Sequence, residues 1–149
     1  MKLLRSVLYL IILTPIAFLR PNSIEIANLK PIEALWVSVD NNNIVISTDT
    51  GDIGCAISVD EALIELKDNS ESVVYFDTAR FLFVDESATK YLPEISPYVK
   101  TTIRLCQWDG QGDIRDAIRY ADSRKIGIKL NRWNDVGKMP EIPSLSKQK

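Results

Sequence analysis

The amino-acid sequence predicts an α/β protein with a mixed central sheet of about five or six strands. About three helices flank this sheet, and an N-terminal apolar helix precedes it. Two segments carry apolar residues at the i, i+3, i+4, i+7 spacing of a helix that packs on one side. Between and around them lie short runs rich in Val, Ile, Phe and Leu, of strand length. The 149 residues, 46% hydrophobic and 26% charged, are enough for one folded domain and too few for two.

The N-terminal segment has the layout of an export signal. Met1–Arg5 is cationic, and the fourteen residues Ser6–Leu19 carry no charge. As a helix, Leu3–Leu19 would span roughly 25 Å, slightly less than the hydrocarbon core of a bilayer. Bulky residues in Ala17–Pro21 stand where a signal peptidase needs small ones, which favours an uncleaved anchor over a cleaved signal. We expect residues 3–19 to contact the membrane, with the rest of the chain outside the cytoplasm, or secreted if cleavage occurs.

Four segments follow from this pattern. Residues 1–20 form the signal-like segment or membrane anchor, 21–33 a linker, 34–137 a single α/β domain and 138–149 a flexible tail. The tail is predicted because it holds two prolines and three lysines.

The first half of the domain predicts a hairpin and a helix. Ala34–Val39 and Ile44–Thr48 alternate apolar and polar residues around an Asn-rich turn, which is typical of a β-hairpin. Ser58–Glu61 is a capping box, and a helix over about 59–68 follows it.

The second half predicts further strands and two helices. Ser72–Val84 holds two apolar runs, which fit two buried strands or one long bent strand equally well. Asp85 opens a short helix that Pro93 and Pro97 limit, and Asp113 caps a third helix. Two more strands are predicted, at Thr101–Trp108 and at Ile126–Leu130.

Composition excludes several kinds of function. The chain has no histidine and two cysteines, so the common zinc sites and the Ser-His and Cys-His nucleophile pairs are absent. From residue 21 onward there are 20 acidic and 15 basic residues, a net charge of −5. An acidic body without a basic stripe argues against nucleic-acid binding.

Two Asp-Thr motifs resemble the paired loops of aspartic proteases. They are Asp49-Thr50-Gly51 and Asp77-Thr78-Ala79. Only 28 residues separate the two aspartates, and a helix is predicted between them, whereas each protease loop needs its own lobe. We therefore interpret Asp49 as part of a turn and Asp77 as part of a strand junction.

Three other candidate features fall short of a site. The stretch Thr50–Gly54 lacks the lysine of a phosphate-binding loop, so we interpret it as a flexible connector. The acidic cluster Asp85, Glu86 and Glu94 lacks the spacing of a calcium loop and is interpreted as a solvated helix start. Cys55 and Cys106 fit two buried free thiols better than a disulfide. The sequence thus predicts no catalytic residue, no cofactor and no metal.

Several stretches, taken in order, resemble the N-terminal domain of the Ger(x)C family, the C-subunit lipoproteins of spore germinant receptors. The matching stretches are Ile24–Leu29, Ala34–Asp40, Ile57–Leu63, Tyr75–Val84 and Thr102–Cys106. The family is lipid-anchored through a cysteine that this chain lacks, so anchoring here would use the apolar segment itself. The resemblance implies integral-membrane germinant-receptor subunits as partners and the spore inner membrane as the location.

Our leading hypothesis is a non-enzymatic, membrane-anchored extracytoplasmic domain that acts by protein-protein contacts in spore germination or sporulation. It predicts an exposed apolar patch on an otherwise acidic surface. The alternative is a secreted domain that binds a small ligand at the carboxyl ends of its strands, near Asp77, Asp109 and Gly110. An enzyme is the third hypothesis.

Overall fold

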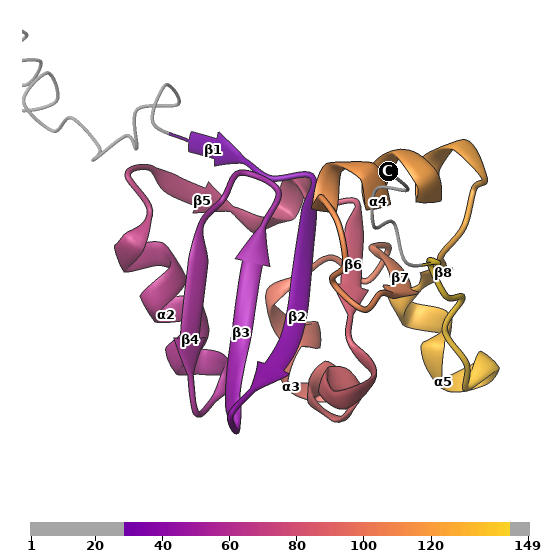
Figure 1. The fold of residues 1–149 in the computed structure, drawn as a ribbon, viewed down its shortest axis with the longest axis horizontal. Helices are drawn as coiled ribbons and strands as arrows, with labels where there is room; N and C mark the ends of the chain where they lie inside the picture. The colour runs from indigo at the N-terminus through magenta and orange to yellow at the C-terminus, as the bar shows by residue number, and fades with distance from the viewer. Residues whose placement is uncertain (1–28, 144–149) are drawn as a thin grey trace, which may run out of the picture.

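A mixed six-stranded sheet organises the protein (Figure 1), as the sequence predicts. The computed structural model describes residues 29–143. The strand order is β4-β3-β2-β6-β7-β8. The strands are β2 (Ala34–Asp40), β3 (Asn43–Thr48), β4 (Ile53–Ala56), β6 (Phe81–Val84), β7 (Arg104–Gln107) and β8 (Ile128–Lys129).

Pairing within the sheet follows from the connections. β2, β3 and β4 are antiparallel neighbours, β2, β6 and β7 are parallel, and β8 runs antiparallel to β7. The predicted hairpin joins β2 to β3 through Asn41 and Asn42, whose φ angles are 47° and 69°. Asparagine tolerates this left-handed backbone better than most residues, and two such residues match the twist of a tight hairpin.

One face of the sheet packs on α2 (Val59–Asn69) and the helical turns η3 (Glu86–Tyr91), α3 (Leu92–Ile95) and η4 (Ser96–Tyr98). The capping box forms as predicted, because the Ser58 side chain accepts a hydrogen bond from the backbone N–H of Glu61. The apolar stripe of α2 and the inward residues of β2, β3 and β6 share one core; among them are Val37, Ile46, Leu66 and Leu82.

The other face of the sheet is covered by α4 (Ile114–Ser123), which lies over the β6 and β7 side. Asp113 caps this helix, as predicted, by accepting from the N–H of Arg115. Ala117, Ile118 and Ala121 pack there against the aromatic rings of Phe81 and Phe83. The fold is therefore layered, with helices on both faces of the sheet.

The β-rich stretch at 72–84 forms two strands, not one long bent strand. β5 (Val73–Tyr75) leaves the main sheet and pairs in parallel with β1 (Leu29–Pro31), and the 3-10 turn η2 (Phe76–Thr78) separates it from β6. The last predicted strand is shorter than expected, since only Ile128–Lys129 pair before η5 (Leu130–Arg132) and α5 (Trp133–Val136).

Both ends of the folded body reach further than the predicted boundaries of 34 and 137. The sequence predicts a linker that includes residues 29–33, yet β1 pairs with β5 and Ile32 is buried. It predicts a flexible tail from residue 138, yet Met139 and Ile142 are buried, and the Ile142 N–H donates a hydrogen bond to the Gln107 carbonyl. Burial of Met139 and Ile142 stabilises this part of the chain, although its prolines and lysines are typical of a flexible tail.

The predicted N-terminal apolar helix lies outside the described residues. Within residues 29–143, no helix has the length and apolar character needed to cross a membrane.

Candidate functional site

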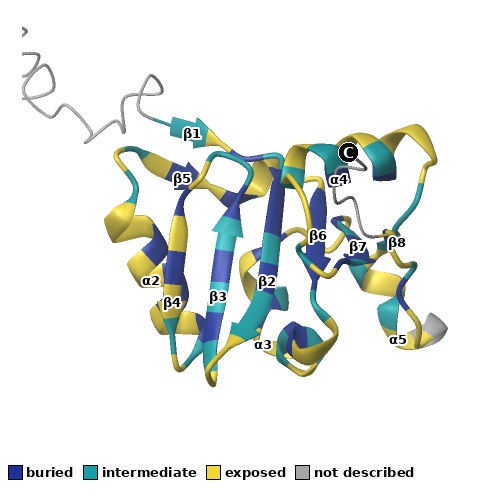
Figure 2. Ribbon diagram, in the orientation of Figure 1, coloured by how far each residue is buried: buried dark blue, intermediate teal, exposed yellow. Residues whose placement is uncertain are grey.

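Half of one sheet face has no helix on it (Figure 2). The strand register places Trp36 and Ser38 of β2, Val45 and Ser47 of β3, and Ile53 and Cys55 of β4 on the same face. We call these six residues the open face. Ile53 is 52% exposed, Cys55 is exposed, and the other four are half-buried. An apolar residue this exposed, on a flat surface, is the kind of feature that contact surfaces display.

The edge of the sheet beside the open face is closed. β4 is the edge strand, and two of its outward backbone groups are bonded to side chains of α2. Glu65 Oε2 accepts from the Cys55 N–H at 2.9 Å, and Asn69 Nδ2 donates to the Ile53 carbonyl at 3.3 Å. These bonds leave little for an added strand to pair with at these positions. A partner would therefore contact the face of β4 and not its edge.

The two halves of the described chain differ in net charge. Residues 29–98, which include β2, β3, β4 and α2, carry 13 acidic and 4 basic residues, a net charge of −9. Residues 99–143, which include β7, β8 and α4, carry 6 acidic and 9 basic residues, a net charge of +3. The open face thus belongs to the strongly acidic half of the protein.

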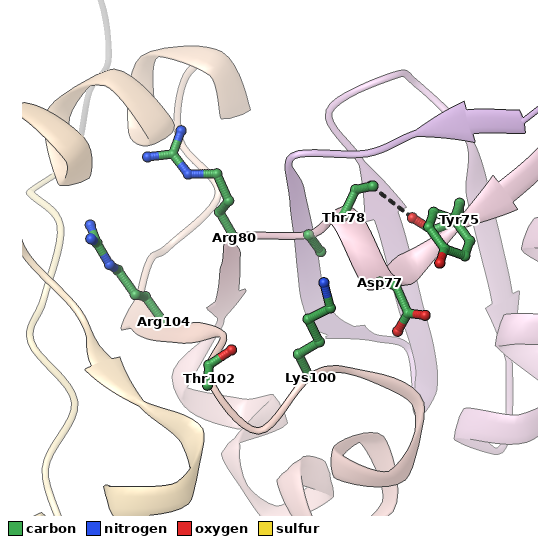
Figure 3. A pocket seen from close by; sticks show the side chains of 8 residues that line it. Tyr75, Asp77, Thr78, Arg80, Lys100, Thr102 and Arg104 are labelled. Atoms are coloured by element: carbon green, nitrogen blue, oxygen red, sulfur yellow. Dashed lines mark hydrogen bonds between the residues drawn. The ribbon is translucent and has the colours of Figure 1, made fainter.

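A cleft of about 420 Å³ lies at the amino ends of β6 and β7 (Figure 3). Three cations line it, Arg80, Lys100 and Arg104, against one carboxylate, Asp77. Tyr75, Thr78, Ala79 and Thr102 complete the lining. A hydrogen bond from the Tyr75 hydroxyl to the Asp77 carboxylate raises the pKa of Tyr75.

Ion pairs hold the two arginines of the cleft. Arg80 bonds to Glu33 at 2.6 Å and to Asp122 of α4 at 2.7 Å, and Arg104 lies 3.6 Å from the same Asp122 oxygen. Both guanidinium groups also lie over the buried ring of Phe81, at 5.4 and 5.6 Å from its centre. These contacts attach the end of α4 to the sheet.

The two Asp-Thr motifs anchor the chain that leads into β2. Asp49 Oδ1 accepts from the N–H groups of Glu33 and Ala34 at 2.8 and 3.0 Å. Thr78 Oγ1 accepts from the N–H of Ile32 at 3.0 Å and donates to its carbonyl at 2.9 Å. This agrees with the interpretation of Asp49 and Asp77 as turn and junction residues, since both motifs tie down the segment 32–34.

Asp52, for which no role is predicted, is buried in the turn before β4. Its carboxylate binds Lys30 at 2.9 Å and accepts hydrogen bonds from Thr48 and Thr50. Burial opposes its ionisation, but the hydrogen bonds and the Lys30 charge outweigh burial and lower the pKa of Asp52 to about 2. Thr50–Gly54 is therefore a fixed turn and the start of an edge strand, not a flexible connector.

The residues predicted for a small-ligand site lie at opposite ends of the sheet. Asp77 precedes β6, so it is at the amino ends of the parallel strands, whereas Asp109 and Gly110 follow β7 at the carboxyl ends. At Gly110, with φ of 74°, an added Cβ would lie 2.1 Å from the Trp36 ring. The prediction that Asp77 lies with Asp109 and Gly110 is thus wrong, because Asp77 follows β5, which lies outside the main sheet, and precedes β6.

Both cysteines are free, as expected, but only Cys106 is buried. Cys55 and Cys106 lie on β4 and β7, four strand positions apart, roughly 19 Å at normal strand spacing. A disulfide needs Cα atoms within about 7 Å, so this geometry excludes one. Burial raises the pKa of the Cys106 thiol to about 12.

Within residues 29–143, no group of three or more Cys, Asp or Glu side chains is placed to hold a metal ion. In the acidic cluster Asp85, Glu86 and Glu94, the Asp85 side chain accepts a hydrogen bond from the Ser87 N–H and caps η3. Asp85 therefore has a structural role at the start of this turn.

Sequence reasoning missed the cleft, because its three cations come from separate segments that only the parallel pairing of β6 and β7 brings together. The open face did leave a signal, since alternation in Ile44–Thr48 indicates a strand with only one buried face.

Comparison with family models, curated proteins and solved structures finds no match to this chain.

Proposed function

We propose that this protein is a non-enzymatic, membrane-anchored domain that works outside the cytoplasm by binding other proteins. The observation that supports this proposal is the open face, an uncovered half of a sheet that exposes Ile53 and Cys55. A sheet face left without a helix normally carries polar residues, as antiparallel strands facing water do. Here apolar Val45 and Ile53 interrupt the polar ones, and Trp36, which packs on Trp108 and Gly110, borders them.

The charge of the surrounding half defines the partner's chemistry. Because residues 29–98 have a net charge of −9, long-range attraction favours a partner that carries lysine and arginine beside its apolar contact. Ile57, 75% exposed directly after β4, extends the apolar contact available to it. The resemblance to germinant-receptor C subunits makes integral-membrane receptor subunits the partners proposed, in germination or sporulation.

Anchoring through residues 3–19 would serve this function directly. A tethered domain searches for a membrane partner in two dimensions, which raises the effective concentration of each for the other. A weak contact surface then suffices, and the open face is small.

The anchor is tested by fractionating growing and sporulating cells that carry the full tagged chain. We expect intact Met1 in carbonate-resistant membranes of sporulating cells. A soluble product that starts near residue 21 and is present during growth would overturn the anchored, sporulation-linked function.

The open face is tested by site-specific photo-crosslinking from position 47 of the full-length chain in those membranes. We expect an adduct with an integral-membrane protein that Ile53→Arg abolishes and Ile64→Arg retains. Ile64 is a matched control because it is 58% exposed on α2, away from the open face. Equal loss with both variants, or no adduct, would contradict docking on this face.

A further inference from the structure

The basic cleft lies at the end of the domain where the N-terminal segment enters. β1 begins at Leu29 and pairs with β5, whose last residue, Tyr75, lines the cleft. Arg80 and Arg104 stand at the amino ends of β6 and β7, at the same end of the sheet (Figure 1). The entry point of the chain and the cleft thus share one end of the protein.

The chain between the apolar segment and β1 is short. Nine residues lie between Leu19 and Leu29, so ten Cα-to-Cα steps join them, which corresponds to a root-mean-square distance of about 17 Å for a random coil and at most about 36 Å for an extended chain. If residues 3–19 lie in the membrane, as the proposed function holds, the end with the cleft is the end nearer the bilayer.

Three cations and one carboxylate line the cleft, and because Glu33 and Asp122 pair with the two arginines, Lys100 is the lining cation whose charge is not paired. Within residues 29–143, the Lys100 ammonium group has no hydrogen bond or ion pair, whereas Arg104 Nη1 is buried and lies 3.6 Å from an Asp122 carboxylate oxygen. Asp77, the one carboxylate of the lining, already accepts from the Tyr75 hydroxyl. Figure 3 shows the Lys100 ammonium group on the side of Asp77, with the guanidinium groups of Arg80 and Arg104 extending away from it.

The arginines of the cleft are preorganised. Glu33 and Asp122 hold the Arg80 guanidinium by ion pairs. The guanidinium groups of Arg80 and Arg104 lie 5.4 and 5.6 Å from the centre of the Phe81 ring. A cation whose orientation is already fixed loses little conformational entropy when an anion binds. Lys100 is exposed and flexible, so it supplies the adjustable contact.

We propose that this cleft binds the phosphate group of an anionic lipid headgroup and so orients the tethered domain on the membrane. Arginine and lysine are the usual protein ligands of phosphate, and basic residues near an anionic bilayer are attracted to it. Tyr75, 42% exposed at the rim of the cleft, is the type of residue that lies at the headgroup level. With its basic end on the membrane, the domain directs the open face of β4 sideways, toward neighbours in the same membrane. This inference rests on the membrane anchoring in the proposed function.

The test uses the full chain in nanodiscs of neutral phosphatidylcholine or of the same lipid mixed with phosphatidylglycerol. The rate of acetylation of Lys100 is measured by mass spectrometry, with Lys90 as the internal reference. Lys90 is exposed on η3, which follows the carboxyl end of β6 at the far end of the sheet. We expect phosphatidylglycerol to slow Lys100 acetylation about fivefold, high salt to restore it, and Lys90 to stay unchanged.

A charge variant extends the test without altering the fold. Amide hydrogen exchange at residues 75–80 and 100–104 should slow with phosphatidylglycerol in the wild type and in Lys90→Glu, but not in Lys100→Glu. Lys100 has no partner to lose within the described residues, so Lys100→Glu should unfold at the same temperature as the wild type.

Each other outcome overturns the proposal. Equal protection of Lys100 in both kinds of nanodisc would mean that contact is independent of headgroup charge. Protection by free glycerol phosphate in neutral detergent, with none from the lipid, would assign the cleft to a soluble phosphate compound. If the full chain fails to enter nanodiscs, both the membrane anchoring and the orientation are contradicted. A failed photo-crosslink from position 47 would contradict only the docking on the open face, not the headgroup contact.

Discussion

The two halves of the sheet bury their side chains in different ways. In β6 all four residues, Phe81–Val84, are buried, because α2 and its neighbours cover one face and α4 covers the other. In β3, buried residues alternate with half-buried ones, because only the face toward α2 is covered. One sheet thus contains a central strand of the kind found in parallel α/β folds and a one-sided antiparallel hairpin.

The difference shows which half stabilises the fold and which half is available for contacts. Apolar side chains on both faces of β6 leave it no surface for a partner. The hairpin has such a surface, and α2 closes the neighbouring edge of β4 through Glu65 and Asn69. A closed edge beside an uncovered face limits uncontrolled strand pairing while it leaves the face open.

Replacing a large side chain in the two-sided half should have the largest effect on stability. Phe83 is fully buried between the Phe81 and Trp108 rings, so Phe83→Ala should lower the free energy of unfolding by about 4 kcal/mol. Val45→Ala on the open face should lower it by about 1 kcal/mol or less. Denaturant unfolding of both variants measures the contrast, and similar losses would mean that the open face is covered.

The hairpin half depends on close contact with α2, and Gly54 is where the contact is tightest. An added Cβ would lie 1.9 Å from the Ala62 carbonyl oxygen and 2.7 Å from the Leu66 nitrogen. Gly54→Ala should therefore lower the free energy of unfolding by about 3 kcal/mol, since α2 must move.

Gly51 provides the matched glycine. Its φ is 91°, but nothing lies within 4 Å of an added Cβ, so Gly51→Ala should cost only about 1 kcal/mol of backbone strain. Equal thermal shifts for the two variants would contradict the close approach of β4 and α2.

Local sequence patterns predict well which strands are buried on one face and which are buried on both. The alternation in Ile44–Thr48 and the continuous run Phe81–Val84 distinguish one-sided from two-sided strands, and the mixed sheet is confirmed. The caps Ser58 and Asp113 are confirmed because each bond joins residues close in sequence. Such features need no knowledge of tertiary structure.

Features that depend on distant pairs escaped prediction. β5 has the apolar composition of a core strand, yet it pairs with β1 outside the main sheet. No local sequence pattern predicts which strand β5 pairs with. The cleft is likewise assembled from residues 24 apart along the chain, Arg80 and Arg104, that the parallel pairing of β6 and β7 joins. Asp52 resembles an ordinary turn residue until Lys30 is placed beside it.

Acid should weaken the hairpin half through Asp52. Its pKa is about 2 in the folded protein against 3.8 for the ordinary side chain, so its ionised form stabilises the fold. That contribution, about 2 kcal/mol, is fully present above about pH 5 and is lost as the pH falls from about 4 toward 2. The wild type and Asp52→Asn should therefore differ most in unfolding free energy near neutral pH and converge at low pH.

Asp68→Asn, at an exposed position of α2, is the control for that titration and should show little difference from the wild type at any pH. A constant gap between Asp52→Asn and the wild type from neutral pH to pH 2 would contradict the lowered pKa of Asp52.

The two cysteines report on the two halves with the least disturbance to the fold. Cys55 is exposed on the open face, whereas Cys106 is buried under α4 and burial raises its pKa to about 12. Ellman's reagent should therefore modify one thiol quickly in the native protein and the second only on unfolding, and Cys55→Ser should remove the fast phase alone. In membranes that contain the partner, the Cys55 reaction should slow and Ile53→Arg should restore its rate, because the same face is occupied. A Cys55 rate that is the same with and without the partner would place the contact elsewhere on the protein.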